Sequence, residues 1–311
     1  MFEIIGKTNF NFIGVRKYAF TLSACLVLLG LAAFVSILLG KAPMGIDFTG
    51  GTLIQGNFDR PVDIGRIRSA LAGNGFPEAN IQKLDIVGAE NSFLIRVKTV
   101  PEGLAAGDVT TGQKILTIIK DAFPDNAFHK DSEHTIGPAV GETLRSQAKW
   151  AVLLAVAGIL IYIWIRFDFR FGVAATIATF HDVLAVLGIL WALGIEIDLL
   201  VITALLTLGG YSLTDTVVVY DRIRENLKLF RKKGDFIATV NVSINEVLSR
   251  TIMTSLTTII VVIVLFFFGG QVLRSMSLAM TMGIIVGTYS SWFVASPIVV
   301  EWEARSPKRF K

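Results

Sequence analysis

Residues 252–268 read IMTSLTTIIVVIVLFFF, a run without a single charged side chain. A helix needs roughly 20 apolar residues to cross about 30 Å of hydrocarbon, and this run approaches that length. The whole chain has the same character, because 53% of its 311 residues are apolar and 17% are charged. Soluble domains average about 25% charged residues. The sequence therefore predicts a polytopic α-helical membrane protein.

Further stretches have the length and apolar character of membrane spans. The predicted transmembrane helices cover residues 18–40, 149–166, 171–193, 197–221, 251–269 and 276–300. The first follows Arg16 and Lys17, as the apolar core of a signal peptide would. Its apolar run is too long for that, and no small-residue cleavage site follows it. We expect a retained anchor and a fold of six spans.

Lysine and arginine in the segments between spans predict the orientation, since these residues collect on the cytoplasmic side. They are frequent in residues 1–17, 222–250 and 301–311. The link between the third and fourth spans has none, and the link between the fifth and sixth has Arg274 alone. We therefore expect cytoplasmic termini, a cytoplasmic connector at 222–250 and an outer domain at 41–148.

The outer segment alternates between strand-like and helix-like patterns. Strands are predicted at 52–58, 79–87, 92–99 and 127–136, and helices at 61–72 and 107–122. The order βαββαβ is typical of a ferredoxin-like α+β sandwich. The segment has no catalytic constellation, and we expect His129 and His134 to be surface residues on opposite strand faces. With a single cysteine, Cys25, the chain has no disulfide framework. No metal or cofactor is predicted.

Two glycine-rich segments join this domain to the membrane spans. Their notable residues are Asp47, Phe48, Gly50 and Gly51 in the first, and Gly137, Pro138 and Gly141 in the second. Glycine permits positive φ and close backbone approach, and proline fixes φ. Such segments suit hinges or tight packing joints, and we favour that role over direct ligand contact.

Charged groups inside the predicted spans are the candidate functional site, because charge within a bilayer is costly and is usually functional. The third span carries His181 and Asp182 near its midpoint, and the fourth carries Asp215 in its inner half. Arg250 enters the fifth span at the inner boundary, from which its side chain can extend toward Asp215. Asp215 is then either a proton carrier with Arg250 as counter-charge or half of a static ion pair, and the residues alone leave both readings open.

The fourth span contributes further candidates around Asp215. Tyr211 and Ser212 are expected one turn earlier on the same helix face, and the Gly209-Gly210 pair permits a close helix approach or a kink. The end of this span carries Asp221, Arg222, Arg224 and Glu225. We expect these charges to form a solvated helix end rather than a reactive site.

Residues 210–226, GYSLTDTVVVYDRIREN, closely resemble the fourth-span signature of the SecF branch of the SecD/SecF family of bacterial protein-export membrane subunits. Supporting matches are the DFTGG run at 47–51, GPAVG at 137–141, His181-Asp182, and Arg250-Thr251 with Thr254-Ser255. The resemblance implies half of a resistance-nodulation-division-like transporter in the bacterial cytoplasmic membrane. It also implies that Asp215 and Arg250 serve proton passage.

The resemblance further implies partners and a task. The partners would be SecD, the SecYEG channel, YajC and YidC, with unfolded preprotein as the substrate and no role for nucleic acid. The task would be to use the proton-motive force to promote late preprotein translocation and release.

Two other functions are weighed against this one. Half of a proton-coupled efflux transporter for small molecules or lipids would normally need a far larger outer domain. An intramembrane aspartyl protease using Asp182 and Asp215 would need a Gly-x-Gly-Asp element, but His181 and Thr214 precede the two aspartates. We therefore do not expect an enzyme.

Overall fold

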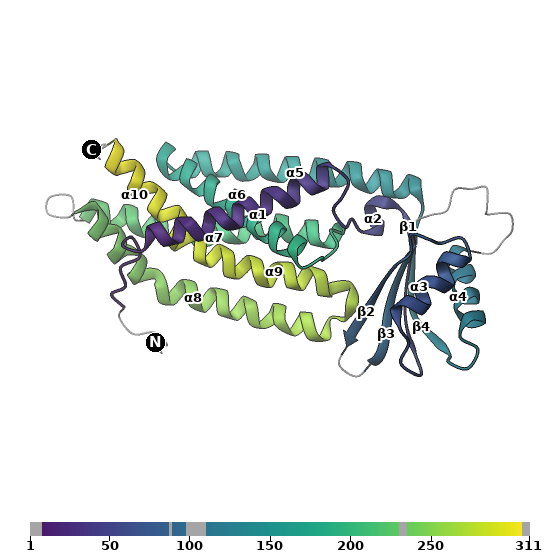
Figure 1. Cartoon of the computed structure of the whole chain (residues 1–311). Helices are drawn as coiled ribbons and strands as arrows, with labels where there is room; N and C mark the ends of the chain where they lie inside the picture. The colour runs from purple at the N-terminus through teal and green to yellow at the C-terminus, as the bar shows by residue number, and fades with distance from the viewer. Residues whose placement is uncertain (1–7, 87–88, 98–109, 230–234, 307–311) are drawn as a thin grey trace. The chain divides into compact units, whose positions relative to one another are not determined.

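The computed structural model describes residues 8–86, 89–97, 110–229 and 235–306. The chain divides into two compact units (Figure 1). One unit comprises Met1–Pro43 and Ala151–Lys311, and the other is Met44–Trp150. We describe each unit by itself.

Six helices in the described part of the chain are long and apolar enough to cross a membrane, as the sequence predicts. They are α1 (Arg16–Leu38), α5 (Pro138–Arg166), α6 (Phe169–Ala192), α7 (Leu199–Leu229), α8 (Phe236–Phe268) and a sixth composite helix. The composite helix consists of α9 (Gly270–Ser290), a π-helical turn (Ser291–Ala295) and α10 (Ser296–Arg305).

Several helices extend beyond the predicted spans. The helix α5 begins at Pro138 rather than near residue 149, because proline is well tolerated in the first turn of a helix. The predicted connector at 222–250 is largely helical: α7 continues to Leu229, and α8 starts at Phe236 with Asp235 as its N-cap. Residues 230–234 of that connector lie outside the described part.

The central helices of the bundle can be recognised by burial. In its most apolar window, α6 is 61% buried and the composite helix 72%, whereas α1, α5 and α8 are 11–17% buried. The exposed apolar faces of these outer helices suit contact with lipid chains. Buried polar side chains lie on α6, α7, α8 and the composite helix, and the buried aspartates among them are Asp182 of α6 and Asp215 of α7.

Glycines set the closest helix crossings. A Cβ atom on Gly30 of α1 would lie 2.2 Å from the carbonyl oxygen of Leu184, and one on Gly188 of α6 would lie 2.6 Å from the Gly30 nitrogen. On α9, Gly287 lies against Ser212 of α7. Small residues let membrane helices approach closely enough for dense packing.

The segment that precedes α1 is bound to α8. Asn245 accepts from the Phe10 nitrogen at 2.9 Å and donates to the Phe10 carbonyl at 2.9 Å. One turn earlier, Asn241 accepts from the Ile13 nitrogen at 3.1 Å. These amides satisfy backbone groups that have no helical partner.

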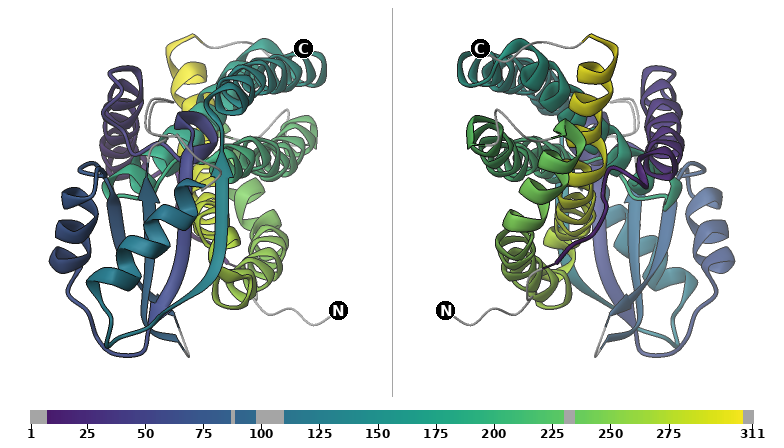
Figure 2. Two further views of the ribbon diagram at one scale, coloured as in Figure 1. Left: turned by 90° about the vertical axis from the view of Figure 1, so that its right-hand side faces the viewer. Right: turned by 90° about the vertical axis from the view of Figure 1, so that its left-hand side faces the viewer.

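The second unit is a four-stranded antiparallel sheet in the order β2-β3-β1-β4. Its elements are β1 (Gly51–Phe58), α3 (Ile64–Gly73), β2 (Asn80–Ile86), β3 (Ala89–Val97), α4 (Thr111–Ala122) and β4 (Phe128–Ile136). This is the predicted ferredoxin-like βαββαβ arrangement. Figure 2 shows α3 and α4 against one face of the sheet. Gly88, between the second and third predicted strands, and Gly107, the predicted start of the second helix, lie outside the described residues.

One apolar core holds this unit together. Ile54 and Phe58 of β1, Phe93 and Ile95 of β3, and Ile115 of α4 are buried in it. His129 is exposed and lies 3.0 Å from Asp59, and His134 is also exposed. Within the described ranges, no three residues of the His, Cys, Asp and Glu types are grouped to hold a metal ion.

Candidate functional site

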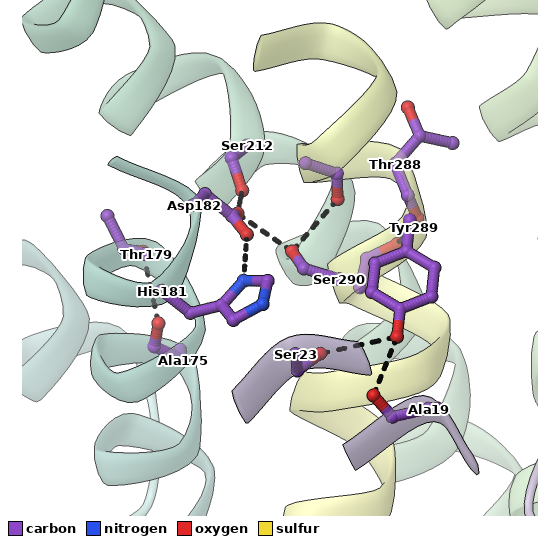
Figure 3. A network of polar contacts seen from close by, with 12 residues as sticks. Ala19, Ser23, Ala175, Thr179, His181, Asp182, Ser212, Thr288, Tyr289 and Ser290 are labelled. Carbon is purple, nitrogen blue, oxygen red and sulfur yellow. Dashed lines mark hydrogen bonds and ion pairs between the residues drawn. The ribbon is translucent and has the colours of Figure 1, made fainter. Parts of the chain in front are cut away.

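Asp182 of α6 is the most enclosed ionisable group of the candidate site, with no solvent exposure. Its Oδ1 atom lies 2.8 Å from Nδ1 of His181, and its Oδ2 atom accepts a hydrogen bond from Ser290 of α9 at 2.7 Å. Ser212 of α7 also donates to Oδ2 (Figure 3). Three helices therefore meet at one carboxylate.

His181 is nearly as enclosed, with 4% of its surface exposed. Its Nε2 atom is buried and has no hydrogen-bond partner among the described residues. Tyr289 of α9 lies beside the imidazole with 6.5 Å between ring centroids. The Tyr289 hydroxyl donates to the Ala19 carbonyl at 2.9 Å and lies 3.2 Å from Ser23 (Figure 3). The His181–Asp182 pair therefore lies next to Tyr289, which hydrogen-bonds to α1.

Asp215 of α7 belongs to a second polar cluster. It is buried, and its Oδ2 atom lies 3.5 Å from the hydroxyls of Ser255 on α8 and Thr288 on α9. Those two hydroxyls lie only 2.6 Å apart. Both distances to the carboxylate are at the long limit for a hydrogen bond, so the hydroxyls bind each other more closely than they bind Asp215.

Arg250 is not a partner of Asp215 in this structure. Its side chain is exposed and forms no ion pair with any described residue. Residues five apart on a helix point about 140° apart and differ by about 7.5 Å in height. Because α8 turns Ser255 toward α7, it turns Arg250 away. The predicted ion pair is therefore wrong for this arrangement of helices. Arg250 does not contact Asp215 here, either as the counter-charge of a proton carrier or as half of a static ion pair.

Ser212, Tyr211 and Gly210, the predicted neighbours of Asp215 on α7, do not contact its carboxylate. Ser212 binds Asp182 rather than sharing a cluster with Asp215. The Tyr211 hydroxyl is buried and has no partner among the described residues. In the Gly209-Gly210 pair, a Cβ on Gly209 would lie 3.4 Å from Ile159 of α5, an ordinary van der Waals contact, and one on Gly210 would meet nothing within 4 Å.

The charges at the end of α7 join helices rather than forming a reactive site. Asp221 pairs with Arg166 of α5 at 2.5 Å and not with Arg224, although the spacing along the helix suited Arg224. Arg222 binds Glu225 and Glu246 of α8, each at 2.7 Å. The Arg224 side chain has no ion pair within the described ranges. Exposed ion pairs of this kind contribute about 0–1 kcal/mol each.

The first glycine segment is a tight backbone joint. Residues 46–49, which include Asp47 and Phe48, form the short helix α2 (Ile46–Thr49). Gly50 and Gly51 follow at φ values of 69° and 138°. Side chains are rarely accommodated at such angles, which explains the glycines.

The second glycine segment is the start of a helix. Pro138 to Gly141 form the first turn of α5. A Cβ on Gly141 would lie 3.2 Å from the Gly50 nitrogen, and Arg145 donates to the Phe48 carbonyl at 2.5 Å. The two segments therefore pack against each other, with Gly137 at the entry to α5.

Sequence reasoning missed two residues, each of which contacts one of the two buried carboxylates. Thr288 and Ser290 lie two positions apart on α9 and contact Asp215 and Asp182 respectively. The available signal was a concentration of small polar residues in the sixth span: Ser277, Thr281, Thr288, Ser290, Ser291 and Ser296. Such hydroxyls are common in membrane helices, so they do not reveal a carboxylate partner without the packing.

Comparison with known proteins identifies the family. Residues 115–305 match the family model described as protein export membrane protein SecD/SecF, C-terminal. The protein translocase subunit SecF of Thermodesulfovibrio yellowstonii is 49% identical over 96% of this chain and 97% of its own length. The SecF subunit of Pseudomonas aeruginosa is 36% identical over 93% of this chain and 90% of its own length.

Solved structures show the same relationship. The crystal structure of SecDF from Thermus thermophilus, a translocon-associated membrane protein, matches with a TM-score of 0.80 and 38% identity. The match covers 96% of this chain and 39% of the SecDF chain. SecDF in its super-membrane-facing form matches with a TM-score of 0.67, 39% identity and coverage of 98% and 40%. The chain is a multi-pass membrane protein that belongs to the SecF family of protein translocase subunits.

Proposed function

We propose that this chain is the SecF half of a protein-export machine and acts together with a SecD half. Its relatives are named protein translocase subunits, and the chain corresponds to about two fifths of the solved SecDF chain. The observation that carries the proposal is Asp215, a buried carboxylate in the helical bundle that contacts hydroxyls from two further helices. A carboxylate in that setting can take up and release a proton.

Proton passage supplies free energy on the scale that a helix movement requires. One charge crossing ~100 mV of membrane potential releases roughly 2.3 kcal/mol. A few such steps can reverse the populations of two conformations that differ by a few kcal/mol. We propose that Asp215 carries the proton and that this movement promotes late preprotein translocation and release. Arg250 would act at the cytoplasmic entrance, and His181 with Asp182 would form the neighbouring charged pair.

The expected wider partners are the SecYEG channel, YajC and YidC, with unfolded preprotein as substrate. The efflux alternative is not favoured, because the relatives are translocase subunits and the outer unit is small. These relatives are also not enzymes by name. The site accordingly has a mechanical and not a catalytic role in this proposal.

The proposed partnership can be tested by copurification. A tagged form of the chain is expressed in its native host and solubilised from the membrane in mild detergent. It is expected to retain a SecD-type subunit, because the helices α1, α5 and α8 of this half are largely uncovered. Vesicles that contain both halves are expected to show faster preprotein translocation when a proton gradient is present. Recovery of the chain alone, with export indifferent to the gradient, would contradict the proposal.

The proposed orientation places both termini and the 222–250 segment in the cytoplasm. A cysteine at Asn74, in the outer unit, is then expected to react with a membrane-impermeant maleimide added to intact spheroplasts. A cysteine at Lys228 is expected to react after lysis but not before. Both residues are exposed, so lack of access would come from the membrane. Reaction of Lys228→Cys in intact cells would overturn the topology.

A further inference from the structure

The cluster around Asp215 contains more oxygen contacts than the ionised carboxylate can satisfy. Three contacts join Asp215 Oδ2, the Ser255 hydroxyl and the Thr288 hydroxyl: one of 2.6 Å and two of 3.5 Å. Each contact needs one proton between its two oxygens. A hydroxyl supplies one proton and an ionised carboxylate supplies none. Two protons are therefore available for three contacts.

A protonated Asp215 removes the shortage. The carboxylic acid supplies the third proton, so the acid, Ser255 and Thr288 can form a closed ring in which each group donates once and accepts once. Neither hydroxyl has another hydrogen-bond partner in the described part of the chain.

Asp182 shows the opposite balance. Its two oxygens receive contacts from Ser212, Ser290 and His181. Two hydroxyl protons and the Nδ1 proton fill all three contacts when the carboxylate is ionised. The Ser290 hydroxyl also lies 3.1 Å from the Gly287 carbonyl, which can accept its proton in place of Asp182. Asp182 can therefore fill its three contacts while ionised, whereas ionised Asp215 leaves one contact of its cluster without a proton.

The two clusters are joined through α9. Thr288 and Ser290 point in nearly opposite directions, as residues two apart on a helix do. Thr288 thus reaches Asp215 while Ser290 reaches Asp182 (Figure 3 shows the Asp182 side). The π-helical turn Ser291–Ala295 follows at once, and the Tyr220 hydroxyl of α7 donates to its Ala295 carbonyl at 3.0 Å. Such turns are frequent at functional sites.

We propose that Ser255 and Thr288 are positioning residues that form a proton-dependent clasp with Asp215. Proton uptake closes the ring and draws α9 toward α7 and α8 at Thr288. Loss of the proton reopens one contact of the ring, while Ser290 stays bound to Asp182. This inference rests on the proposed proton role of Asp215, and adds the residues through which its protonation state reaches the composite helix.

Other ionisable groups on the helices packed against α7 are accounted for. On α6, His181 and Asp182 bind each other. On α8, Arg250 is exposed and Glu246 is held by Arg222 and Asn226. On α9, Tyr289 is bound to α1 and Arg274 lies over the Phe266 ring of α8. Arg170 of α6 is paired with Glu303, and the π-helical turn contains no ionisable residue. The clasp therefore depends on Asp215 and the two hydroxyls.

The clasp predicts the sign of a titration shift in Thr288→Val, which removes one hydroxyl and keeps the branched shape. Without the Thr288 hydroxyl, only the contact between Asp215 and Ser255 remains. The number of hydrogen bonds in the cluster then falls from two to one when Asp215 is ionised, and from three to one when it is protonated. The protonated form loses more. The pH at which Asp215 titrates is therefore expected to fall by about 0.5–1 unit, the equivalent of one buried hydrogen bond.

The measurement is infrared titration of the protonated-carboxyl band, in the complex of this chain with its SecD-type partner in lipid vesicles. The Asp215 band is the one that Asp215→Asn removes. Thr288→Ser is expected to restore the wild-type midpoint. Thr281→Val is the matched control, because the Thr281 hydroxyl of α9 binds only the Ser277 carbonyl among the described residues.

An unchanged midpoint, or a rise in it, would overturn the clasp, since a hydroxyl that merely solvates the carboxylate would raise the midpoint when removed. If Thr288→Val does not assemble, Ser255→Ala tests the same count and the same sign. The titration requires no export. Normal export by Asp215→Asn together with a lowered midpoint in Thr288→Val would therefore refute the proposed function and leave the clasp standing.

Discussion

Asp215→Asn is expected to abolish the proton-gradient stimulation of preprotein translocation while leaving the chain in its complex. Asparagine keeps the size of the side chain but cannot take up and release a proton in the physiological range. Its amide can still contact the hydroxyls of Ser255 and Thr288, so the helices α7, α8 and α9 keep their packing. The measurement compares translocation into vesicles with and without a proton gradient, at matched amounts of complex.

Asp168→Asn is the matched control for this experiment. Asp168 is an exposed carboxylate at the N-cap of α6 and forms no side-chain cap bond. Its replacement is expected to leave the stimulation at the wild-type level. Stimulation of Asp215→Asn vesicles to the wild-type extent would rule out Asp215 as the proton carrier.

Arg250→Met, measured in the same assay, tests whether the Arg250 guanidinium takes part in proton passage. Arg250 has no contact with Asp215 here, so a strong loss of stimulation would place its action in another conformation of the bundle. Arg224→Met is the comparison, because Arg224 also has no ion pair in the described part of the chain. We expect Arg250→Met to lower the stimulation and Arg224→Met to preserve it. Equal results for the two variants would remove Arg250 from the proton path.

Gly30→Leu is expected to produce the largest loss of stability among single substitutions in the bundle. Its Cβ would lie 2.2 Å from the Leu184 carbonyl oxygen, an atom of the α6 backbone that cannot rotate away. Helices α1 and α6 must then separate along their contact. We expect a destabilisation of at least about 3 kcal/mol, at the upper end for overpacked sites. The readout is the thermal unfolding midpoint in detergent, expected to fall by roughly 6–12 °C.

Gly158→Leu tests whether this effect comes from the crossing or from glycine itself. Gly158 lies on the apolar helix α5, and a Cβ there would meet nothing within 4 Å. The substitution adds the same side chain without a clash, and is expected to keep or raise the unfolding midpoint, because leucine favours the helix more than glycine does. Equal destabilisation of both variants would show that the α1–α6 crossing is not the cause.

Apolar length was enough to predict the membrane fold. A run such as 252–268 has no soluble alternative of comparable stability, so each of the six helices could be found without knowing its neighbours. The outer unit was predictable for a related reason, since alternation in β1 and the helical period in α4 are local patterns. The ends of the helices were harder to predict. The helix α5 begins at Pro138, and the sequence did not reveal this because proline is compatible with either a joint or a helix start.

The sequence by itself identified which residues carry charge within the bundle, because cost in the bilayer is a property of the residue and its depth. Tertiary structure alone decided their partners. Ser212 turned to Asp182, Ser255 replaced Arg250 beside Asp215, and Asp221 paired with Arg166. Each partner lies on a different helix, and the rotation and register of one packed helix against another depend on side chains along the whole contact. Spacing within a single helix does not contain that information.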